Sequence, residues 1–504
     1  MDSPILSSAQ MREAEEAAFA RGVEVEKLMD QAGAGIARAL VQFFPKPGRC
    51  LVFAGKGHNG GDALVAAENL KRAGWQIETR LAFPEDECVE LTRKKLESLR
   101  EAECARDFSA ATIGPLSSVS NAPTILLDGL LGVGAKELLR EPIRTSAKEI
   151  NRLRREQNVF VVAIDIPTGL NSDSGETDPE DCVAADFTIT IGFAKHGLIL
   201  DSVIDLVGRL EVVPLPDLVV TESAANESLA TPASMQPALP RRKFSSYKNQ
   251  FGRIGIVAGS EGMIGAAVMT TEGALRAGAG LVELFVPREL YQLMAATAPA
   301  EAMVRPIRSP KDLVERKVDV WAVGPGLGTE RAADLIKFID QARQPMVIDA
   351  DALNALSGKT DLLKRSPGPR LLTPHPGEMQ RLFDTGKMSR AGTARNFSDQ
   401  FPVTLLLKGS RTLVSERAKP LSYNSTGNPG MATGGMGDVL TGVCAGLIGR
   451  GLALYDAARI GAWACGRAAE LAIFNGSESE ESLLPRDVLT HLGAAFNELR
   501  KPIV

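Results

Sequence analysis

The stretch LVFAGKGHNGGDALVAAENLKRAG, residues 51–74, decides the fold of the first half of the chain. Four apolar residues lead into a G-x-G-x-x-G turn at residues 55–60, and a segment rich in helix formers continues to Gly74. This order of strand, glycine turn and helix is the dinucleotide-binding fingerprint, and Glu78 stands near the place of its ribose-binding acid. The turn also contains Asn-Gly-Gly-Asp at residues 59–62, which a hydride-transfer enzyme does not need. The stretch therefore predicts a nucleotide-binding α/β fold and leaves open what its loop holds.

Size and charge set the class of protein. The chain has 504 residues and a net charge of −5, from 57 basic and 62 acidic side chains. This length predicts about two to four domains. The charge gives no basic footprint for nucleic acid, and no apolar run approaches the roughly 20 residues that span a bilayer. The first residues are acidic and amphipathic, unlike a signal peptide. We therefore expect a cytoplasmic protein with no nucleic-acid or membrane partner.

The cysteines and histidines argue against a zinc cage. Six cysteines are widely scattered without a C-x-x-C pair, and only four histidines occur. Such spacing favours buried, reduced thiols over metal ligation.

The chain is expected to form two α/β domains joined by a linker. Residues 217–244 lose apolar periodicity and gain Ser, Pro and charge, which predicts a linker between a domain at 1–216 and a domain at 245–504. On both sides short apolar runs alternate with Ala-rich helical segments. The expected strands are 50–54, 77–82, 124–128, 159–164 and 187–191 in the first half, and 253–258, 281–286, 318–323, 346–349, 370–372 and 403–407 in the second. Several of them run directly into glycine or carboxylate loops, and such loops form ligand sites at the carboxyl ends of parallel strands.

Oxygen-bearing side chains gather around the first glycine loop. The glycines let backbone amides approach an anion at the start of a helix. Asp128 and Asp165 each end a later strand, and oxygens of Asn59, Asp128 and Thr168 suit a hard cation. Taken singly, the glycines are also typical of a tight turn and the aspartates of helix caps.

Three segments identify the first domain by resemblance. GKGHNGGDA, LDGLLGVGAKE and AIDIPTGLNSDSG, preceded by LMDQAG, resemble the NAD(P)H-hydrate epimerase domain in order and spacing over about the first 215 residues. The resemblance implies a Rossmann-like three-layer domain that binds a hydrated nicotinamide nucleotide, uses Asp165 as acid and base, and holds potassium at Asn59, Asp128 and Thr168. The implied substrate contacts are His58, Asn59, Gly60, Gly61, Asp62, Gly132, Val133, Gly134, Ala135, Lys136, Glu137, Leu138 and Asp165. The chain departs from the family pattern at His58, Ala63, Thr168 and Asp30–Gln31, where Asn, Gly, Ser and Glu-Asn are usual.

A glycine-rich junction marks the second site. In NSTGNPGMATGGMGDVLTGVCAGLIGRG, residues 424–451, the amides of Gly434–Gly437 precede a helix expected to begin near Val439. Free amides at a helix start form an anion hole that suits a phosphoryl group, and Asp438 is placed to accept a hydroxyl proton. The alternative is a structural helix start with Asp438 as its cap. No G-x-x-x-x-G-K-[ST] segment occurs, so the chain is not a P-loop enzyme.

Further loops narrow the second domain. The junction resembles ribokinase-like kinases, and with residues 259–284, 324–328, 372–382 and 406–415 it resembles the ADP-dependent NAD(P)H-hydrate dehydratase over about residues 245–500. That resemblance implies a ribokinase-like α/β domain that uses ADP with magnesium. It places Ala266, Gly326, His375 and Asp438 at the hydrate, and Lys408, Gly409, Ser410, Arg411, Thr412 and Gly437 at the adenine nucleotide.

The expected protein is thus a bifunctional repair enzyme for NADH-hydrate and NADPH-hydrate, which epimerises the R and S forms and dehydrates the S form with ADP. The resemblance also implies a homo-oligomer, a tetramer or larger. Two alternatives stay open. The second domain fits a vitamin or sugar kinase, and the first fits a non-catalytic nucleotide-binding scaffold.

Overall fold

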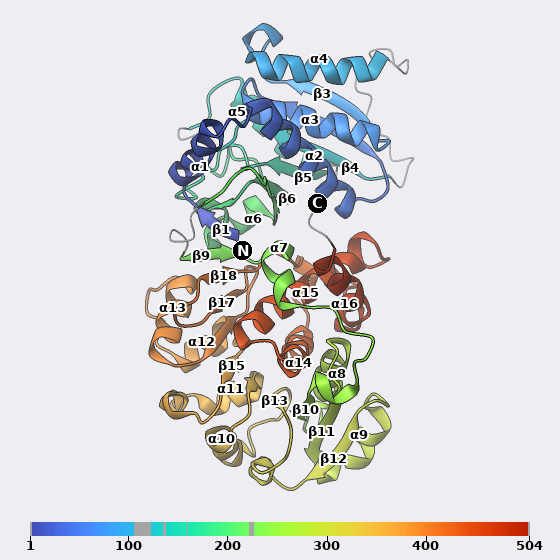
Figure 1. The fold of residues 1–504 in the computed structure, drawn as a ribbon, viewed down its shortest axis with the longest axis vertical. Helices are drawn as coiled ribbons and strands as arrows, with labels where there is room; N and C mark the ends of the chain where they lie inside the picture. Colours follow the sequence, from blue (N-terminus) through green and yellow to red (C-terminus); the bar gives the residue numbers. More distant parts are fainter. Residues whose placement is uncertain (1–2, 105–121, 135–137, 158, 221–225, 502–504) are drawn as a thin grey trace. The chain divides into compact units, whose positions relative to one another are not determined.

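The chain divides into two compact units, Pro4–Ala225 and a second that begins at Asn226 (Figure 1). The structure is a computed structural model that describes residues 3–104, 122–134, 138–157, 159–220 and 226–501. None of the helices in these ranges is long and apolar enough to cross a membrane. Five cysteines (Cys50, Cys88, Cys182, Cys444 and Cys465) are buried free thiols.

The first unit is built on a parallel sheet with strand order β3-β2-β4-β5-β6-β8. Its strands are β2 (Arg49–Ala54), β3 (Gln76–Leu81), β4 (Thr124–Gly129), β5 (Phe160–Ile164), β6 (Phe187–Ile191) and β8 (Arg209–Val213). Its helices are α1 (Ser8–Ala20), α2 (Val25–Phe43), α3 (His58–Arg72), α4 (Glu90–Cys104), α5 (Ile143–Gln157) and α6 (Ile204–Val207). A short strand β1 (Ser3–Leu6) pairs in parallel with β7 (Ala194–Lys195).

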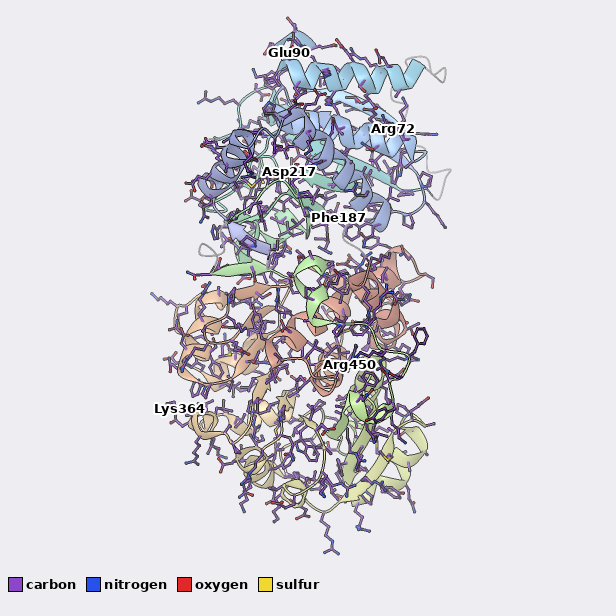
Figure 2. All side chains as sticks on the ribbon, viewed as in Figure 1. Arg72, Glu90, Phe187, Asp217, Lys364 and Arg450 are labelled. Carbon is purple, nitrogen blue, oxygen red and sulfur yellow. The ribbon has the colours of Figure 1, made fainter. Side chains whose placement is uncertain are left out.

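Register brings the strand ends of this sheet together. Ala54 at the end of β2 pairs with Gly129 at the end of β4, and Asp128 pairs with Ala163 of β5. The loops after β2, β4 and β5 therefore leave the sheet at one edge. Phe187, labelled in Figure 2, begins β6 and is buried, and its ring centroid lies 4.9 Å from that of Phe43.

The second unit contains a larger sheet with order β12-β11-β10-β13-β14-β15-β16-β17-β18-β9. Pairing is parallel from β12 to β16 and antiparallel from β16 to β18. The strands are β9 (Glu227–Leu229), β10 (Arg253–Val257), β11 (Leu281–Pro287), β12 (Met303–Ile307), β13 (Val320–Val323), β14 (Met346–Ile348), β15 (Arg370–Leu372), β16 (Thr404–Leu407), β17 (Leu413–Ser415) and β18 (Leu421–Tyr423).

Glycines allow two helices of this unit to pack closely. A Cβ added at Gly442 of α14 would lie 2.0 Å from the carbonyl oxygen of Thr270 in α8, and one at Gly273 would lie 2.6 Å from that of Val439. The helices are α7 (Pro232–Met235), α8 (Ile264–Arg276), α9 (Tyr291–Thr297), α10 (Ala332–Gln341), α11 (Ala350–Leu356), α12 (Pro376–Leu382), α13 (Arg390–Gln400), α14 (Met436–Gly449), α15 (Leu454–Phe474) and α16 (Pro485–Leu499).

Both units are α/β with parallel sheets, as predicted, and all eleven expected strands occur with ends within two residues of those expected. The linker differs from the expected 217–244. Residues 226–244 belong to the second unit, where β9 pairs with β18 and α7 begins at a Thr231–Ser234 capping box. A three-residue strand and a one-turn helix are too short to show periodicity, which is why this segment looked like a linker in the sequence.

Candidate active sites

The glycines of the first loop serve backbone packing. A Cβ at Gly55 would lie 1.9 Å from the carbonyl oxygen of Leu130, and one at Gly60 would lie 2.1 Å from that of Gly55. Gly57 caps α3, so residues 58–62 form the first turn and a half of that helix. Of the predicted substrate contacts there, His58 is exposed, Asn59 and Asp62 are half-buried, and Gly60 and Gly61 are buried.

Asp128 and Thr168 meet beneath this loop. Asp128 is fully buried, and Thr168 donates to it from its hydroxyl at 2.7 Å and from its backbone nitrogen at 2.8 Å. Burial raises the pKa of Asp128 to about 6 against these hydrogen bonds. Asn59 lies close by, since a Cβ at Gly132 would be 3.3 Å from its Oδ1, and its Nδ2 is buried without a hydrogen-bond partner. A buried carboxylate that meets only neutral donors, with the amide oxygen of Asn59 nearby, suits a cation.

Asp165 is held by a lysine that sequence reasoning missed. Its backbone adopts the left-handed region at φ 67°, a conformation that costs energy and is concentrated at functional sites. Its Oδ1 accepts from the Lys195 Nζ at 2.5 Å, the Thr190 hydroxyl at 3.0 Å and the Ile191 backbone nitrogen at 3.0 Å. The Oδ2 accepts no hydrogen bond from the described residues. One oxygen is therefore fixed, while the other is free to accept a further hydrogen bond.

Two more carboxylates share the electrostatic field of this ion pair. Burial first, and then the charges of Asp165 and Glu15, raise the pKa of Asp62 well above its ordinary value. The pKa of Glu15 in α1 is also raised, by burial and by Asp165. Neither Glu15 nor Lys195 stands in a recognisable motif, so only the fold brings them to Asp165.

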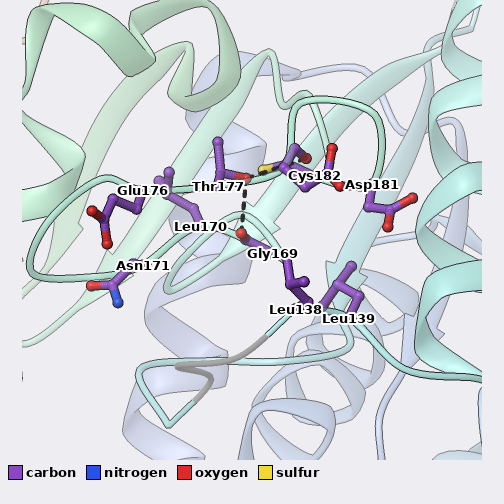
Figure 3. Close-up of a pocket in the computed structure, with 10 residues that line it drawn as sticks. Leu138, Leu139, Gly169, Leu170, Asn171, Glu176, Thr177, Asp181 and Cys182 are labelled. Atoms are coloured by element: carbon purple, nitrogen blue, oxygen red, sulfur yellow. Dashed lines mark hydrogen bonds between the residues drawn. The ribbon is translucent and has the colours of Figure 1, made fainter.

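One of the substrate contacts predicted at residues 132–138, Leu138, lies beside a cavity of about 240 Å³ (Figure 3). Leu138 lines it together with Leu139 and the loop after β5, where the Thr177 hydroxyl donates to the Gly169 carbonyl at 2.9 Å. Gly132, Val133 and Gly134 lie in the turn region that follows β4. Ala135, Lys136 and Glu137 lie outside the described residues.

In the second unit, the glycine junction forms the start of α14. The helix begins at Met436 rather than near Val439, because Gly435 adopts φ 95° and acts as its N-cap. The prediction was wrong because a left-handed glycine allows the helix to start directly after it. Asp438 thus lies in the first turn, among backbone amides that have no partner within the helix. It is not the N-cap, so the structural alternative for this residue does not hold.

Asp438 is surrounded by a charged network centred on Asp349. Asp349, at the end of β14, accepts from the Lys408 Nζ at 2.8 Å and from the Thr441 hydroxyl at 2.8 Å. Glu378 lies 3.8 Å from the same Lys408 nitrogen. Burial raises the pKa of Asp438 to about 6, and the nearby charge of Asp349 adds to the rise. The pKa of Lys408 is raised by these carboxylates, although burial opposes the change.

The other predicted hydrate contacts come from the loops after β13 and β15 and from the first turn of α8. Gly326 has φ 61°, and a Cβ there would lie 3.0 Å from that of Ala266, so the loop after β13 touches α8. His375 is the N-cap of α12, with its Nδ1 accepting from Gly377 at 3.0 Å and Glu378 at 3.3 Å. The cap therefore uses Nδ1, and Nε2 lies 3.6 Å from the Glu378 carboxylate.

Arg390 supports the loop at residues 408–412, which is predicted to bind the nucleotide, through hydrogen bonds to backbone carbonyls. Its guanidinium donates to the carbonyl of Arg411 at 2.9 Å and lies so close that a Cβ at Gly409 would be 2.3 Å away. Gly409 and Ser410 are exposed and Thr412 is half-buried. Arg411 is only 2% exposed, so it is less available to a phosphate than Lys408 beside Gly437, where a Cβ would lie 3.2 Å from the lysine nitrogen.

These features define a two-domain α/β protein with a separate polar site at the carboxyl edge of each parallel sheet. Residues 25–197 match the family model described as YjeF-related protein N-terminus, and residues 254–489 match that of NAD(P)H-hydrate dehydratase. The chain belongs to the family of bifunctional NAD(P)H-hydrate repair enzymes, as its relatives show.

Those relatives cover nearly the whole chain. The bifunctional NAD(P)H-hydrate repair enzyme Nnr of Moorella thermoacetica is 35% identical over 507 residues, covering 94% of this chain and 93% of the relative. The Escherichia coli enzyme of the same name is 33% identical over 469 residues, covering 90% and 87%. Among solved structures, the ADP/ATP-dependent NAD(P)H-hydrate dehydratase of Bacillus subtilis, co-crystallised with ATP/Mg2+, is 28% identical. It covers 55% of this chain and 100% of its own, with a TM-score of 0.49.

Proposed function

We propose that this chain repairs hydrated NADH and NADPH in two steps. The first unit interconverts the R and S hydrates. The second dehydrates the S hydrate with ADP and releases AMP and phosphate. The observation that carries the proposal is the placement of Asp438, whose pKa is about 6, among the free amides at the start of α14. A carboxylate poised near neutral pH beside an anion hole is suited to phosphoryl transfer onto a hydroxyl.

In the dehydration step, Asp438 accepts the proton of the ring hydroxyl as its oxygen attacks the β-phosphorus of ADP. The oxygen–phosphorus bond forms, the bond to AMP breaks, and the amides of Gly434–Gly437 stabilise the charge on the phosphoryl oxygens. Phosphate then leaves, pushed by the ring nitrogen, and loss of a proton from the neighbouring ring carbon restores the double bond. Phosphorylation is required because hydroxide is a poor leaving group.

The nucleotide would lie along Lys408, Gly409, Ser410, Arg411, Thr412 and Gly437, with Ala266, Gly326 and His375 at the hydrate. Magnesium would neutralise the phosphates. Within the described ranges, no three His, Cys, Asp or Glu side chains are arranged to hold a metal ion, so the phosphates and water would supply most of its ligands.

In the epimerisation step, the free Oδ2 of Asp165 would move protons at the substrate while Lys195 fixes the other oxygen. The contacts proposed for the substrate are residues 58–62 and 132–138. Potassium would be held by Asn59, Asp128 and Thr168. The fully buried carboxylate of Asp128, with only neutral donors, supports this assignment.

Nucleotide choice and product identity test the dehydration step. We expect turnover of the S hydrate with ADP and magnesium, little turnover with ATP, and only transient phosphorylation of the hydrate. Faster turnover with ATP would overturn the choice of nucleotide. A stable phosphorylated product would instead identify a small-molecule kinase. We also place the protein in the cytoplasm as a homo-oligomer, which cell fractionation and light scattering test.

A further inference from the structure

Cationic side chains converge at the far end of α14, away from the dehydration site. A cavity of about 650 Å³ is lined by Arg241, Arg242, Asn497, Arg500 and Lys501. Arg450, labelled in Figure 2, is the C-cap of α14, and Arg500 is the C-cap of α16. Twelve residues separate Arg450 from Asp438, which is about 18 Å along a helix.

The turn after α8 anchors two of these guanidinium groups. Arg242 donates to the Gly278 carbonyl at 2.6 Å and stacks on Phe251 with its guanidinium carbon 3.8 Å from the ring centroid. Arg450 donates to the neighbouring Ala277 carbonyl at 3.5 Å. A Cβ at Gly278 would lie 2.5 Å from Arg242 and 3.5 Å from Arg450, so the turn brings the two side chains together.

These cations have no counter-charge within the described part of the chain. None of Arg241, Arg242, Arg450 or Arg500 forms an ion pair with a described residue, and the Nε of Arg500 is buried without a hydrogen-bond partner. Burial and the neighbouring arginines lower the pKa of Arg450 to about 10 and also lower that of Arg500. Helix C-termini favour a cation, which explains Arg450 and Arg500 singly but not why four arginines lie together.

We propose that this cavity binds a phosphate-bearing anion at a site separate from both reactions. Guanidinium groups bind phosphate through paired, charge-assisted hydrogen bonds, and a buried donor without a partner is satisfied by such an anion. The cavity volume lies within the range of small-molecule sites, so it accommodates a phosphorylated small molecule as well as a free phosphate.

Calorimetric titration of the full chain tests the site, with pyrophosphate, inorganic phosphate and AMP as probes. The test variant is R242Q/R500Q, and the control is Arg343→Gln, which alters an exposed arginine of the same unit. We expect the test variant to lose at least about tenfold in affinity for pyrophosphate, and the control to match the parent. Selective loss of AMP binding identifies a nucleotide as the ligand, whereas selective loss of phosphate or pyrophosphate binding identifies a free anion.

Thermal melting separates binding from structure. Arg242→Gln also removes the contacts of Arg242 with Gly278 and Phe251, so the diagnostic quantity is the response to anion. Pyrophosphate should raise the melting temperature of the parent but not that of the test variant. Two results overturn the proposal. One is equal pyrophosphate binding by the parent and the test variant, or none by the parent. The other is an equal rise in melting temperature with pyrophosphate in the parent and in the test variant.

Discussion

Replacement of Asp349 by Asn should move the acid limb of the dehydration pH profile to lower pH. Asp438 acts as a base only when ionised, and its pKa is about 6, raised by burial and then by the charge of Asp349. The rate of the parent should therefore fall about tenfold for each pH unit below 6. Asn keeps the shape of Asp349 but carries no charge, and its single side-chain oxygen can accept from Lys408 or from Thr441, which bond to different oxygens of the carboxylate.

Two effects of this substitution have the same sign. The negative charge that raises the pKa of Asp438 is removed, and Lys408, which lowers that pKa, loses its closest carboxylate. We expect the pKa of Asp438 to fall by on the order of one unit, equivalent to about 1.4 kcal/mol. The acid limb should move by the same amount.

The assay follows dihydronicotinamide absorbance from purified S hydrate at saturating ADP across the acid range, with thermal melts to confirm folding. Asp351→Asn is the matched control, because Asp351 has the weakest of the charge effects on Asp438 and should cause a smaller shift. An acid limb that stays in place or moves to higher pH in Asp349→Asn would refute the role of this network.

Three further predictions concern the cation, the buried ion pair and the helix contact. Potassium should raise the melting temperature of the protein above pH 6 but not below it, because Asp128 has a pKa of about 6 and cannot hold a cation once it is protonated. Equal melting temperatures of the parent and Asp128→Ala in potassium would contradict this. Lys195→Met should cost about 3–5 kcal/mol in urea unfolding by leaving Asp165 unpaired, and a loss under about 1 kcal/mol would contradict it. Gly442→Ala should cost about 1–3 kcal/mol by forcing α8 and α14 apart, whereas the control Gly493→Ala, with open space around it, should not destabilise.

The sequence predicted those strands whose signal lies in consecutive residues. Apolar runs ending in glycine or carboxylate loops located every expected strand, and the parallel topology then explains why Asp128 and Thr168 meet. Short strands such as β9 and β18 escaped detection, because their sequences, Glu-Ser-Leu and Leu-Ser-Tyr, contain polar residues and form no apolar run. The pairing of these two strands with each other is a tertiary contact.

The site residues that sequence reasoning missed depend on tertiary contacts. Lys195 stands in an apolar segment where nothing marks it as buried, and its partner Asp165 is thirty positions earlier in the chain. Asp349 is the last residue of a predicted strand, but its ion pair with Lys408 requires β14 and β16 to lie on either side of β15. Arg390 supports the nucleotide loop through backbone carbonyls, which carry no sequence signal.

The most direct test is recovery of dihydronicotinamide absorbance from a mixture of R and S hydrates with ADP and magnesium. The parent should recover the whole mixture. Asp165→Asn should stop after the S half, apart from slow spontaneous epimerisation, and Asp438→Asn should dehydrate about 10² to 10⁴ times more slowly while still epimerising. Recovery of the R half by Asp165→Asn at the parental rate, or normal dehydration by Asp438→Asn, in variants that melt like the parent, would contradict the two-step repair.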